Sequence, residues 1–183
     1  FGRLIDADDW LIGEDVVKKS VFPSGALRSF IDPHNGGSQL GDPGYQPRTY
    51  AERYKGTEDN GGVHINSGIA NWAFYQFTIR INNDLVKAEK VYYRALTRYL
   101  TRSSRFIDCR KAVIQSAADL FGANSPEVTA ARAAYDFVGI LDGASTPTQE
   151  DVETNPGGDF IVHADDDQTA LYLSDEAGNL VAD

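Results

Sequence analysis

The chain changes character within one stretch, GTEDNGGVHINSGI, which occupies residues 56–69. Residues 1–62 are rich in Gly, Pro, Asp and Asn and lack a sustained 3.6-residue period, so we expect long loops with short helical turns there. From Ile65 onward, apolar residues recur at helical spacing. Long loops inside a compact domain usually carry function, and this stretch joins such loops to the helices.

Four helices are predicted after this stretch. The first two cover about residues 65–79 and 83–100. The third has Ser104 as its N-cap and ends at Gly122, and the fourth begins with a Ser-Pro-Glu cap at Ser125. Short connections make the helices antiparallel neighbours, so the sequence predicts a mainly α chain, a small helical bundle preceded by long ordered loops.

A different pattern follows the helices. Residues 141–158 contain Pro, Gly and acids with no apolar period, which predicts a linker. Residues 159–183 switch to a period of two, with strands expected at 160–162 and 171–173. We therefore expect a helical domain at residues 1–140, then the linker, then a β-hairpin-like extension or the start of a further domain.

The composition narrows the class of protein. With 42% hydrophobic residues, the chain of 183 residues is long enough to bury a core. Asp and Glu outnumber Lys and Arg by 27 to 17, which argues against nucleic acid or an anionic membrane as a partner. The chain contains no run of about 18 apolar residues, so no membrane-spanning helix is predicted. The single Cys109 falls on the apolar face of the third helix, where we expect a small buried hydrophobe.

Asp59 precedes His64 by five residues across a Gly-Gly turn, close enough for its carboxylate to hydrogen-bond the imidazole. Such a carboxylate selects the ring tautomer and stabilises the imidazolium, so His64 is a candidate acid or oxyanion partner. The alternative is that His64 only caps a helix and Asp59 only shapes a turn. The spacing alone leaves both interpretations open.

Residues 59–69 resemble the D-N-G-G-V-H-x-N-S-G-I signature of the thermolysin-like zinc metallopeptidases. The likeness continues in order along the chain, through four further segments that are each similar to a motif of that family: residues 9–16 (DWLIGEDV), 26–33 (ALRSFIDP), 53–57 (RYKGT) and 92–101 (YYRALTRYLT). The colinear match covers about residues 1–140. It implies the C-terminal helical domain of such a peptidase.

The resemblance implies zinc chemistry without a zinc site in this chain. In the family, two histidines of H-E-x-x-H and a downstream glutamate hold the metal, and the motif glutamate is the general base. Here His34, His64 and His163 are too scattered for two of them to lie one helical turn apart. Phe1 and Gly2 resemble the residues just after the third ligand. We therefore expect the zinc ligands in an N-terminal half of the same polypeptide, and this chain to be inactive alone.

The same resemblance implies roles for individual side chains. His64 would hydrogen-bond or protonate the oxyanion of the tetrahedral intermediate, with Asp59 orienting its ring. Arg28 would hold the peptide carbonyl on the leaving-group side, although by itself it is typical of an ordinary surface arginine. The pocket for the residue after the scissile bond would be lined by three side chains that spacing alone assigns to the core: Ile12, Val16 and Leu27.

Calcium is a second metal that the resemblance implies. Asp6, Asp9 and Glu14 match acidic calcium ligands of the family. Leu11 stands where thermolysin itself has a further carboxylate, so one ion or none is expected. The alternative is a solvated acidic loop.

The resemblance thus implies the C-terminal half of a secreted, extracellular zinc endopeptidase that cleaves on the amino side of hydrophobic residues. Its partners would be the N-terminal zinc-binding half and a peptide or protein substrate. The competing hypothesis is a non-catalytic interaction or structural module derived from the same family. An H-E-x-x-H segment encoded just upstream would separate the two hypotheses.

Overall fold

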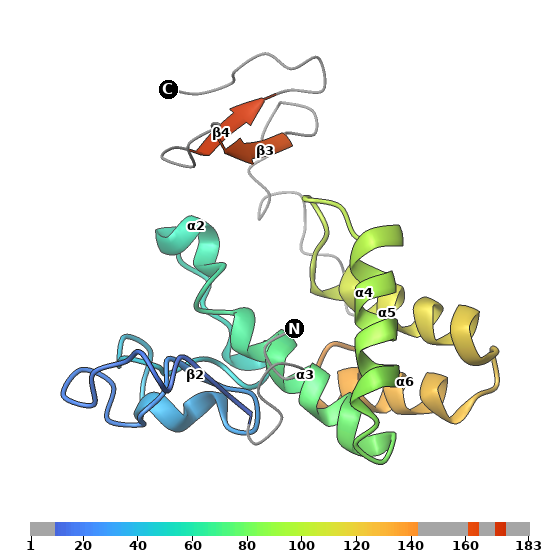
Figure 1. Cartoon of the computed structure of the whole chain (residues 1–183), viewed down its shortest axis with the longest axis horizontal. Helices are drawn as coiled ribbons and strands as arrows, with labels where there is room; N and C mark the ends of the chain where they lie inside the picture. The colour runs from blue at the N-terminus through green and yellow to red at the C-terminus, as the bar shows by residue number, and fades with distance from the viewer. Residues whose placement is uncertain (1–9, 143–160, 165–170, 175–183) are drawn as a thin grey trace. The chain divides into compact units, whose positions relative to one another are not determined.

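The computed structural model describes residues 10–142, 161–164 and 171–174 (Figure 1). The chain forms two units, Phe1–Ala144 and Ser145–Asp183, and each is described by itself. None of the helices in the described ranges is long and apolar enough to cross a lipid bilayer.

Four long helices form the body of the first unit: α3 (Ser67–Arg80), α4 (Leu85–Arg98), α5 (Phe106–Phe121) and α6 (Pro126–Phe137). Helix α5 packs against both α4 and α6, and α6 also packs against α3. The prediction of a mainly α bundle of four helices is confirmed, with ends that differ from the predicted ones by a few residues.

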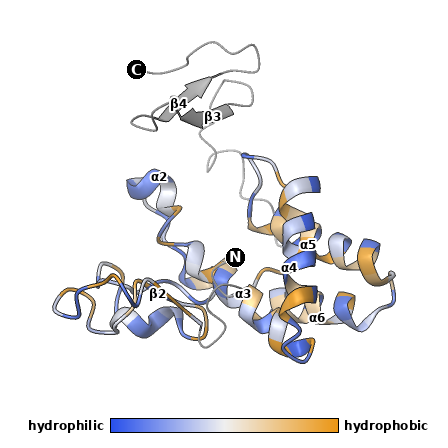
Figure 2. Ribbon diagram, in the orientation of Figure 1, coloured by the Kyte–Doolittle hydropathy of each residue, from blue (hydrophilic) through white to orange (hydrophobic). Residues whose placement is uncertain are grey.

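Large side chains from every helix fill the core of the bundle. Ile69, Phe77, Val91, Val113 and Tyr135 are each at most 1% exposed. Burying one such side chain contributes about 1.5–3 kcal/mol. Buried alanines on α4, α5 and α6 let the helix axes approach closely. Figure 2 shows the hydrophobic residues of the unit gathered along these helices.

Helix α6 begins as the sequence predicts. Ser125 accepts a hydrogen bond from the backbone N–H of Val128 at 3.3 Å, and Pro126 occupies the first turn. Helix α5 ends, also as predicted, at Gly122, whose φ of +99° lies in the left-handed half of φ space.

The predicted N-cap of α5 is wrong by one residue. The cap is Arg105, whose backbone N–H donates to the Asp108 carboxylate at 2.9 Å. Ser104 instead closes the preceding turn, where its hydroxyl accepts from the backbone N–H of Thr101 at 2.9 Å. Asp108, three residues after the cap, therefore determines where α5 begins, and Ser104 stabilises the preceding turn instead.

The apolar face of α4 is only partly buried. Ala88 and Ala95 lie in the core, but Leu96 is 63% exposed and Tyr99 is 39% exposed. Ile79 on α3 is 37% exposed as well. Leu96 lines an open groove on the surface.

Cys109 is half-buried on α5, with its Sγ 3.1 Å from the Tyr135 hydroxyl oxygen. Burial raises the pKa of the thiol, so the neutral form is favoured. The side chain therefore behaves as the small hydrophobe that the sequence predicts.

The loop-rich segment before the bundle contains short elements only: β1 (Leu11–Ile12), β2 (Arg28–Ser29), η1 (Pro33–Gly36), η2 (Tyr50–Glu52) and α2 (Glu58–Gly62). Strands β1 and β2 pair antiparallel. Trp10 and Phe30, which flank this pair, each place their rings 6.0 Å from the Phe74 ring on α3. These aromatic contacts hold the loops against α3, which fixes the position of Arg28 relative to the bundle.

In the second unit, β3 (Ile161–Ala164) and β4 (Leu171–Ser174) pair antiparallel, with Ile161 opposite Ser174. Both strands overlap the positions where the sequence predicts them. Most of the predicted linker lies outside the described residues, so the domain boundaries remain a prediction.

Candidate functional site

The segment that carries Asp59 and His64, residues 57–67, is here called the site loop. It turns through three consecutive residues with left-handed backbone conformation, all within α2. Asp59, Asn60 and Gly61 have φ values of 54°, 49° and 78°. Asp, Asn and Gly are the residues that tolerate this region, so the D-N-G sequence suits the backbone. The turn brings the chain back on itself, and the backbone N–H of Val63 donates to the Asp59 carbonyl at 2.9 Å.

The Asp59 carboxylate closes the loop from within. Its Oδ2 accepts from the backbone N–H of His64 at 2.8 Å and of Ile65 at 3.0 Å. Its Oδ1 lies 2.6 Å from Nδ1 of the His64 ring. The hydrogen bond from the His64 ring, with the two backbone bonds, holds the pKa of Asp59 below its ordinary value of 3.8. Asp59 is therefore ionised at neutral pH.

Because an ionised carboxylate can only accept, Nδ1 of His64 carries the proton. Nε2 is then an acceptor in the neutral ring and a second donor in the imidazolium. The His64 side chain is 75% exposed, whereas Asp59 is 22% exposed. Within the described residues Nε2 has no hydrogen-bond partner. The pair thus offers a bound ligand a ring nitrogen with a negative charge behind it.

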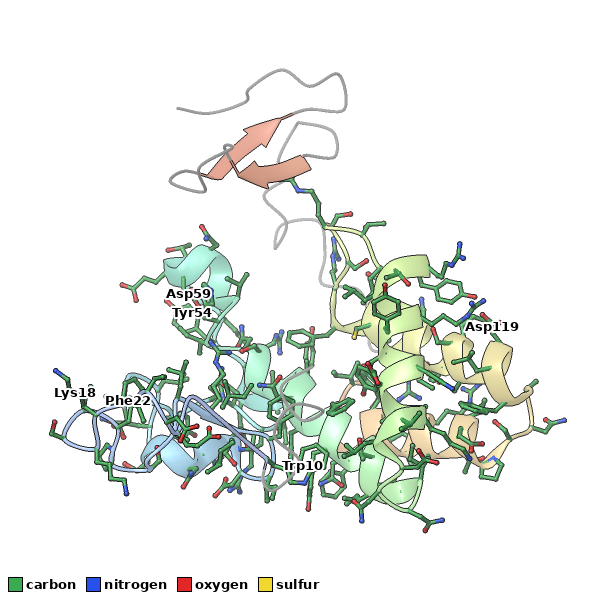
Figure 3. The ribbon with its side chains drawn as sticks, in the orientation of Figure 1. Trp10, Lys18, Phe22, Tyr54, Asp59 and Asp119 are labelled. Carbon is green, nitrogen blue, oxygen red and sulfur yellow. The ribbon has the colours of Figure 1, made fainter. Side chains whose placement is uncertain are left out.

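A second set of contacts anchors the loop to Tyr54, which is labelled with Asp59 in Figure 3. The side-chain amide of Asn66 accepts from the Tyr54 N–H at 2.8 Å and donates to the Tyr54 carbonyl at 3.1 Å. Gly62, with φ of +83°, lies beneath these contacts, and a Cβ there would be 2.7 Å from Cδ1 of Tyr54. The second glycine of the loop is therefore required both by backbone conformation and by space.

Arg28 and His64 are joined through Ser67. The Arg28 guanidinium donates to the Ser67 hydroxyl through Nη1. That hydroxyl donates in turn to the His64 carbonyl at 2.7 Å. Arg28 is thus half-buried and held beside the His64 loop. Ser67 belongs to the N-S-G part of the motif, but its residue type and spacing do not predict this contact with Arg28.

Three apolar side chains predicted for the substrate pocket stay open to solvent. Ile12 is 38% exposed, Leu27 is 39% exposed and Val16 is 82% exposed. Their assignment to the core from spacing alone is therefore wrong. Ile12 lies opposite Arg28 in the β1–β2 pair, and a Cβ on Gly13 would lie 3.0 Å from Leu27 and 3.8 Å from Val16. Leu27 and Val16 thus lie beside Gly13, and Ile12 and Leu27 are the neighbours of Gly13 and Arg28 along the chain.

An open apolar groove of about 380 Å³ continues from Ile12 across the bundle. Its walls come from β1, α3, α4 and α5, and from Phe30 just after β2. Leu96 and Tyr93 of α4 line it and are 63% and 55% exposed. A groove lined by aromatic and aliphatic side chains and open on one side is suited to covering by another apolar surface.

The residues in the described ranges do not form a zinc site, because no three His, Cys, Asp or Glu side chains come together there. For calcium, Asp6 and Asp9 lie outside the described residues. Glu14 is described, and its Oε2 is buried with no hydrogen-bond partner in the part of the chain that the structure describes. A buried carboxylate oxygen in that state fits a cation ligand, because an unpaired buried charge is costly.

Comparisons with known proteins identify the family of this chain. Residues 2–140 match the family described as thermolysin metallopeptidase, alpha-helical domain. The chain is 47% identical to bacillolysin of Brevibacillus brevis over 149 residues and 41% identical to thermolysin of Alicyclobacillus acidocaldarius over 155 residues. Each alignment covers 76% of this chain and 26% of the relative. The chain thus spans about a quarter of the length of the curated relatives it matches.

The fold is also similar to that of a solved structure. The precursor of protealysin, a metalloproteinase from Serratia proteamaculans, superimposes with a TM-score of 0.62 at 30% sequence identity. The match covers 73% of this chain and 41% of the other.

The two glycines of the site loop provide a matched pair for a stability test. Both have φ near +80°, but a Cβ on Gly61 would meet nothing within 4 Å, whereas on Gly62 it would meet Tyr54 and Asn66. We expect Gly61→Ala to cost about 1 kcal/mol from backbone strain. Gly62→Ala should cost at least twice as much, measured by urea denaturation. Equal losses would show that the Tyr54 contacts do not hold the loop.

Proposed function

Because this chain belongs to the thermolysin family of metallopeptidases, as its α-helical domain, we propose that it forms one wall of the active-site cleft of a zinc endopeptidase. In this proposal the parent protein carries the zinc, and this chain supplies the groups that bind the substrate and its oxyanion. The observation that carries the proposal is the Asp59–His64 pair, with its unpartnered Nε2, held beside Arg28 through Ser67.

His64 acts on the charge that develops when a peptide carbonyl is attacked. An imidazolium donates through Nε2 to the oxyanion of the tetrahedral intermediate, while Nδ1 donates to Asp59. The Asp59 carboxylate balances the positive charge and keeps the ring from rotating, so little reorganisation is needed as the oxyanion forms. Zinc, when bound by the other half of the parent, polarises the attacked carbonyl.

In this proposal, Arg28 and the apolar residues beside it bind the substrate. Arg28 donates to a peptide carbonyl on the leaving-group side, a role suited to the several N–H donors of a guanidinium. The exposed side chains of Ile12, Val16 and Leu27 form the pocket for the residue after the scissile bond. An apolar pocket in that place favours cleavage on the amino side of hydrophobic residues.

The partner in this proposal is the N-terminal, zinc-binding half of the same polypeptide. Two observations support it: the apolar groove that extends from Ile12 to Leu96 needs a cover, and the relatives are about four times longer than the matched region. Without that half the chain is inactive. A parent that lacks H-E-x-x-H upstream would instead support the non-catalytic module.

Two further proposals follow the family. Glu14, with its buried and unpartnered Oε2, is a calcium ligand, assisted by Asp6 and Asp9. The parent is secreted and acts outside the cell. Calcium binding is open to direct test by isothermal titration of the complete protein.

His64→Ala in the parent protein tests the oxyanion role. Because the donor acts mainly in the transition state, we expect kcat to fall about 10²–10³-fold while KM changes little. His34→Ala is the matched control, since the His34 ring bonds to Glu52 at 2.9 Å and stacks on Tyr45, away from this loop. Steady-state hydrolysis of a blocked dipeptide amide measures both constants. Full activity of the His64→Ala variant would show that His64 does not stabilise the oxyanion.

Asp59→Asn tests whether Asp59 orients the His64 ring or only shapes the loop. We expect turnover to fall sharply, because the amide can present an N–H where the carboxylate accepted one, so the His64 ring is no longer held in its orientation. Asn keeps the size and most hydrogen bonds, so thermal stability at neutral pH should fall only by the part that the charge of Asp59 contributes.

The stability that the ionised form of Asp59 contributes has a defined pH window. Its pKa is lowered in the folded chain, so the contribution is fully present above 3.8 and is lost as the pH falls through the lowered pKa. Any difference in melting temperature between Asp59→Asn and the unmodified chain should therefore shrink in acid. A variant that melts early but turns over normally would show that Asp59 is only structural.

A further inference from the structure

Gln46 is a buried polar residue next to the site that the sequence motifs do not include. It lies in the loop between η1 and η2 and is 5% exposed. Its backbone N–H donates to the Pro33 carbonyl at 2.8 Å, which fixes the base of the side chain. From there the side chain reaches toward the start of α3.

The side-chain amide of Gln46 makes two contacts with the site loop. Nε2 lies 2.6 Å from the His64 carbonyl oxygen and 2.8 Å from the Ser67 hydroxyl oxygen. The orientation of the amide follows from these neighbours, because the reverse orientation would place Oε1 against the His64 carbonyl, an acceptor facing an acceptor. The amide therefore acts as a donor to both.

These contacts make Ser67 a junction between His64 and Arg28. The Ser67 hydroxyl proton goes to the His64 carbonyl, and its oxygen accepts from both Gln46 and Arg28. The backbone of His64 is thus held at both ends, by Asp59 at its N–H and by Gln46 and Ser67 at its carbonyl. A change at Gln46 is transmitted to both His64 and Arg28.

The motif glycine Gly68 makes room for this arrangement. A Cβ at this position would lie 2.5 Å from Cβ of Gln46 and 2.8 Å from the Pro47 carbonyl oxygen. Alanine is a better helix former than glycine, yet Gly68 is the second residue of α3. The close approach of Gln46 explains why glycine is needed there.

The carbonyl oxygen of the Gln46 side-chain amide lowers the stability of the fold. Oε1 is buried and has no hydrogen-bond partner among the described residues. An unpartnered buried carbonyl lowers stability, and an apolar side chain of the same length would fill the space without that penalty. Packing alone therefore does not account for a glutamine, whereas the two donated hydrogen bonds do.

We propose that Gln46 is a positioning residue, whose amide fixes the His64 carbonyl and the Ser67 hydroxyl and so sets His64 and Arg28 in one arrangement. This inference rests on the proposed function, because it deepens the account of the same site. Gln46 does not touch the substrate and acts only through His64, Ser67 and Arg28.

Gln46→Met is the variant that tests the proposal, because methionine keeps the length of the side chain and removes both donated bonds. Thr78→Val is the matched control, since Thr78 is fully buried on the same helix as Ser67 and donates to the Phe74 carbonyl at 2.8 Å. Gly68→Ala is a second, independent variant, which forces Gln46 away from α3 without changing its chemistry.

The first readout needs only this chain. The carbon-bound ring protons and ring nitrogens of His64, assigned by comparison with His64→Ala, are followed by NMR. We expect them to shift and broaden in Gln46→Met and in Gly68→Ala, because the ring loses one fixed position, and to stay in place in Thr78→Val. His64 ring signals that coincide with those of the unmodified chain in both test variants would overturn the proposal.

The second readout uses the complete parent protein. We expect Gln46→Met to lower kcat/KM by about 10-fold to 100-fold, in line with the effect of a misplaced catalytic group, and Thr78→Val to stay within about twofold. The losses from Gln46→Met and Ser67→Ala should not add, because both act through one junction. A Gln46→Met parent as active as the Thr78→Val parent would contradict the proposal. A silent His64→Ala would contradict the proposed function instead, and the NMR comparison would still decide the role of Gln46.

Discussion

The site depends on one carboxylate that accepts three N–H groups at once. Asp59 binds the backbone of His64 and Ile65 and the Nδ1 of the His64 ring, so the same group closes the loop and fixes the ring. Two non-glycine residues, Asp59 and Asn60, adopt left-handed conformations to make this possible. Such strain costs of order 1–3 kcal/mol per residue and persists only where the surroundings determine it. Here the surroundings are the contacts of Asn66 with Tyr54 and of Gln46 with the His64 carbonyl.

Helix α3 connects this loop to the rest of the unit. Its first residue, Ser67, belongs to the site, while Ile69 and Phe77 lie fully buried in the bundle. Its other side is covered by the loop-rich segment, through the rings of Trp10 and Phe30 against Phe74. A helix covered on both sides moves little, so the loops that carry Arg28 and the loop that carries His64 are placed against one rigid element. This is how long loops are able to form a defined site.

The helix caps and the contact between Asp59 and His64 could be predicted from local sequence, but the features that depend on tertiary contacts could not. The caps at Ser125 and Gly122 act through neighbours a few residues away, and the five-residue spacing predicted the contact between Asp59 and His64. Tertiary contacts decided the other features. Spacing assigned Ile12, Val16 and Leu27 to the core because periodicity reports a shared face but not what covers it. No periodic pattern predicts the contact of Gln46 with His64, 18 residues away, or that of Ser67 with Arg28, 39 residues away.

In the proposed function, this chain supplies the oxyanion wall of a peptidase whose zinc is held elsewhere in the parent. Reconstitution is the decisive experiment. The upstream, zinc-binding half of the parent is produced separately and mixed with this chain, and peptide hydrolysis is measured for each part and for the mixture. We expect no activity from either part alone, activity from the mixture, and loss of that activity when the chain carries His64→Ala. Activity of the upstream half by itself, or a mixture whose activity does not change with His64→Ala, would show that this chain does not have the proposed role.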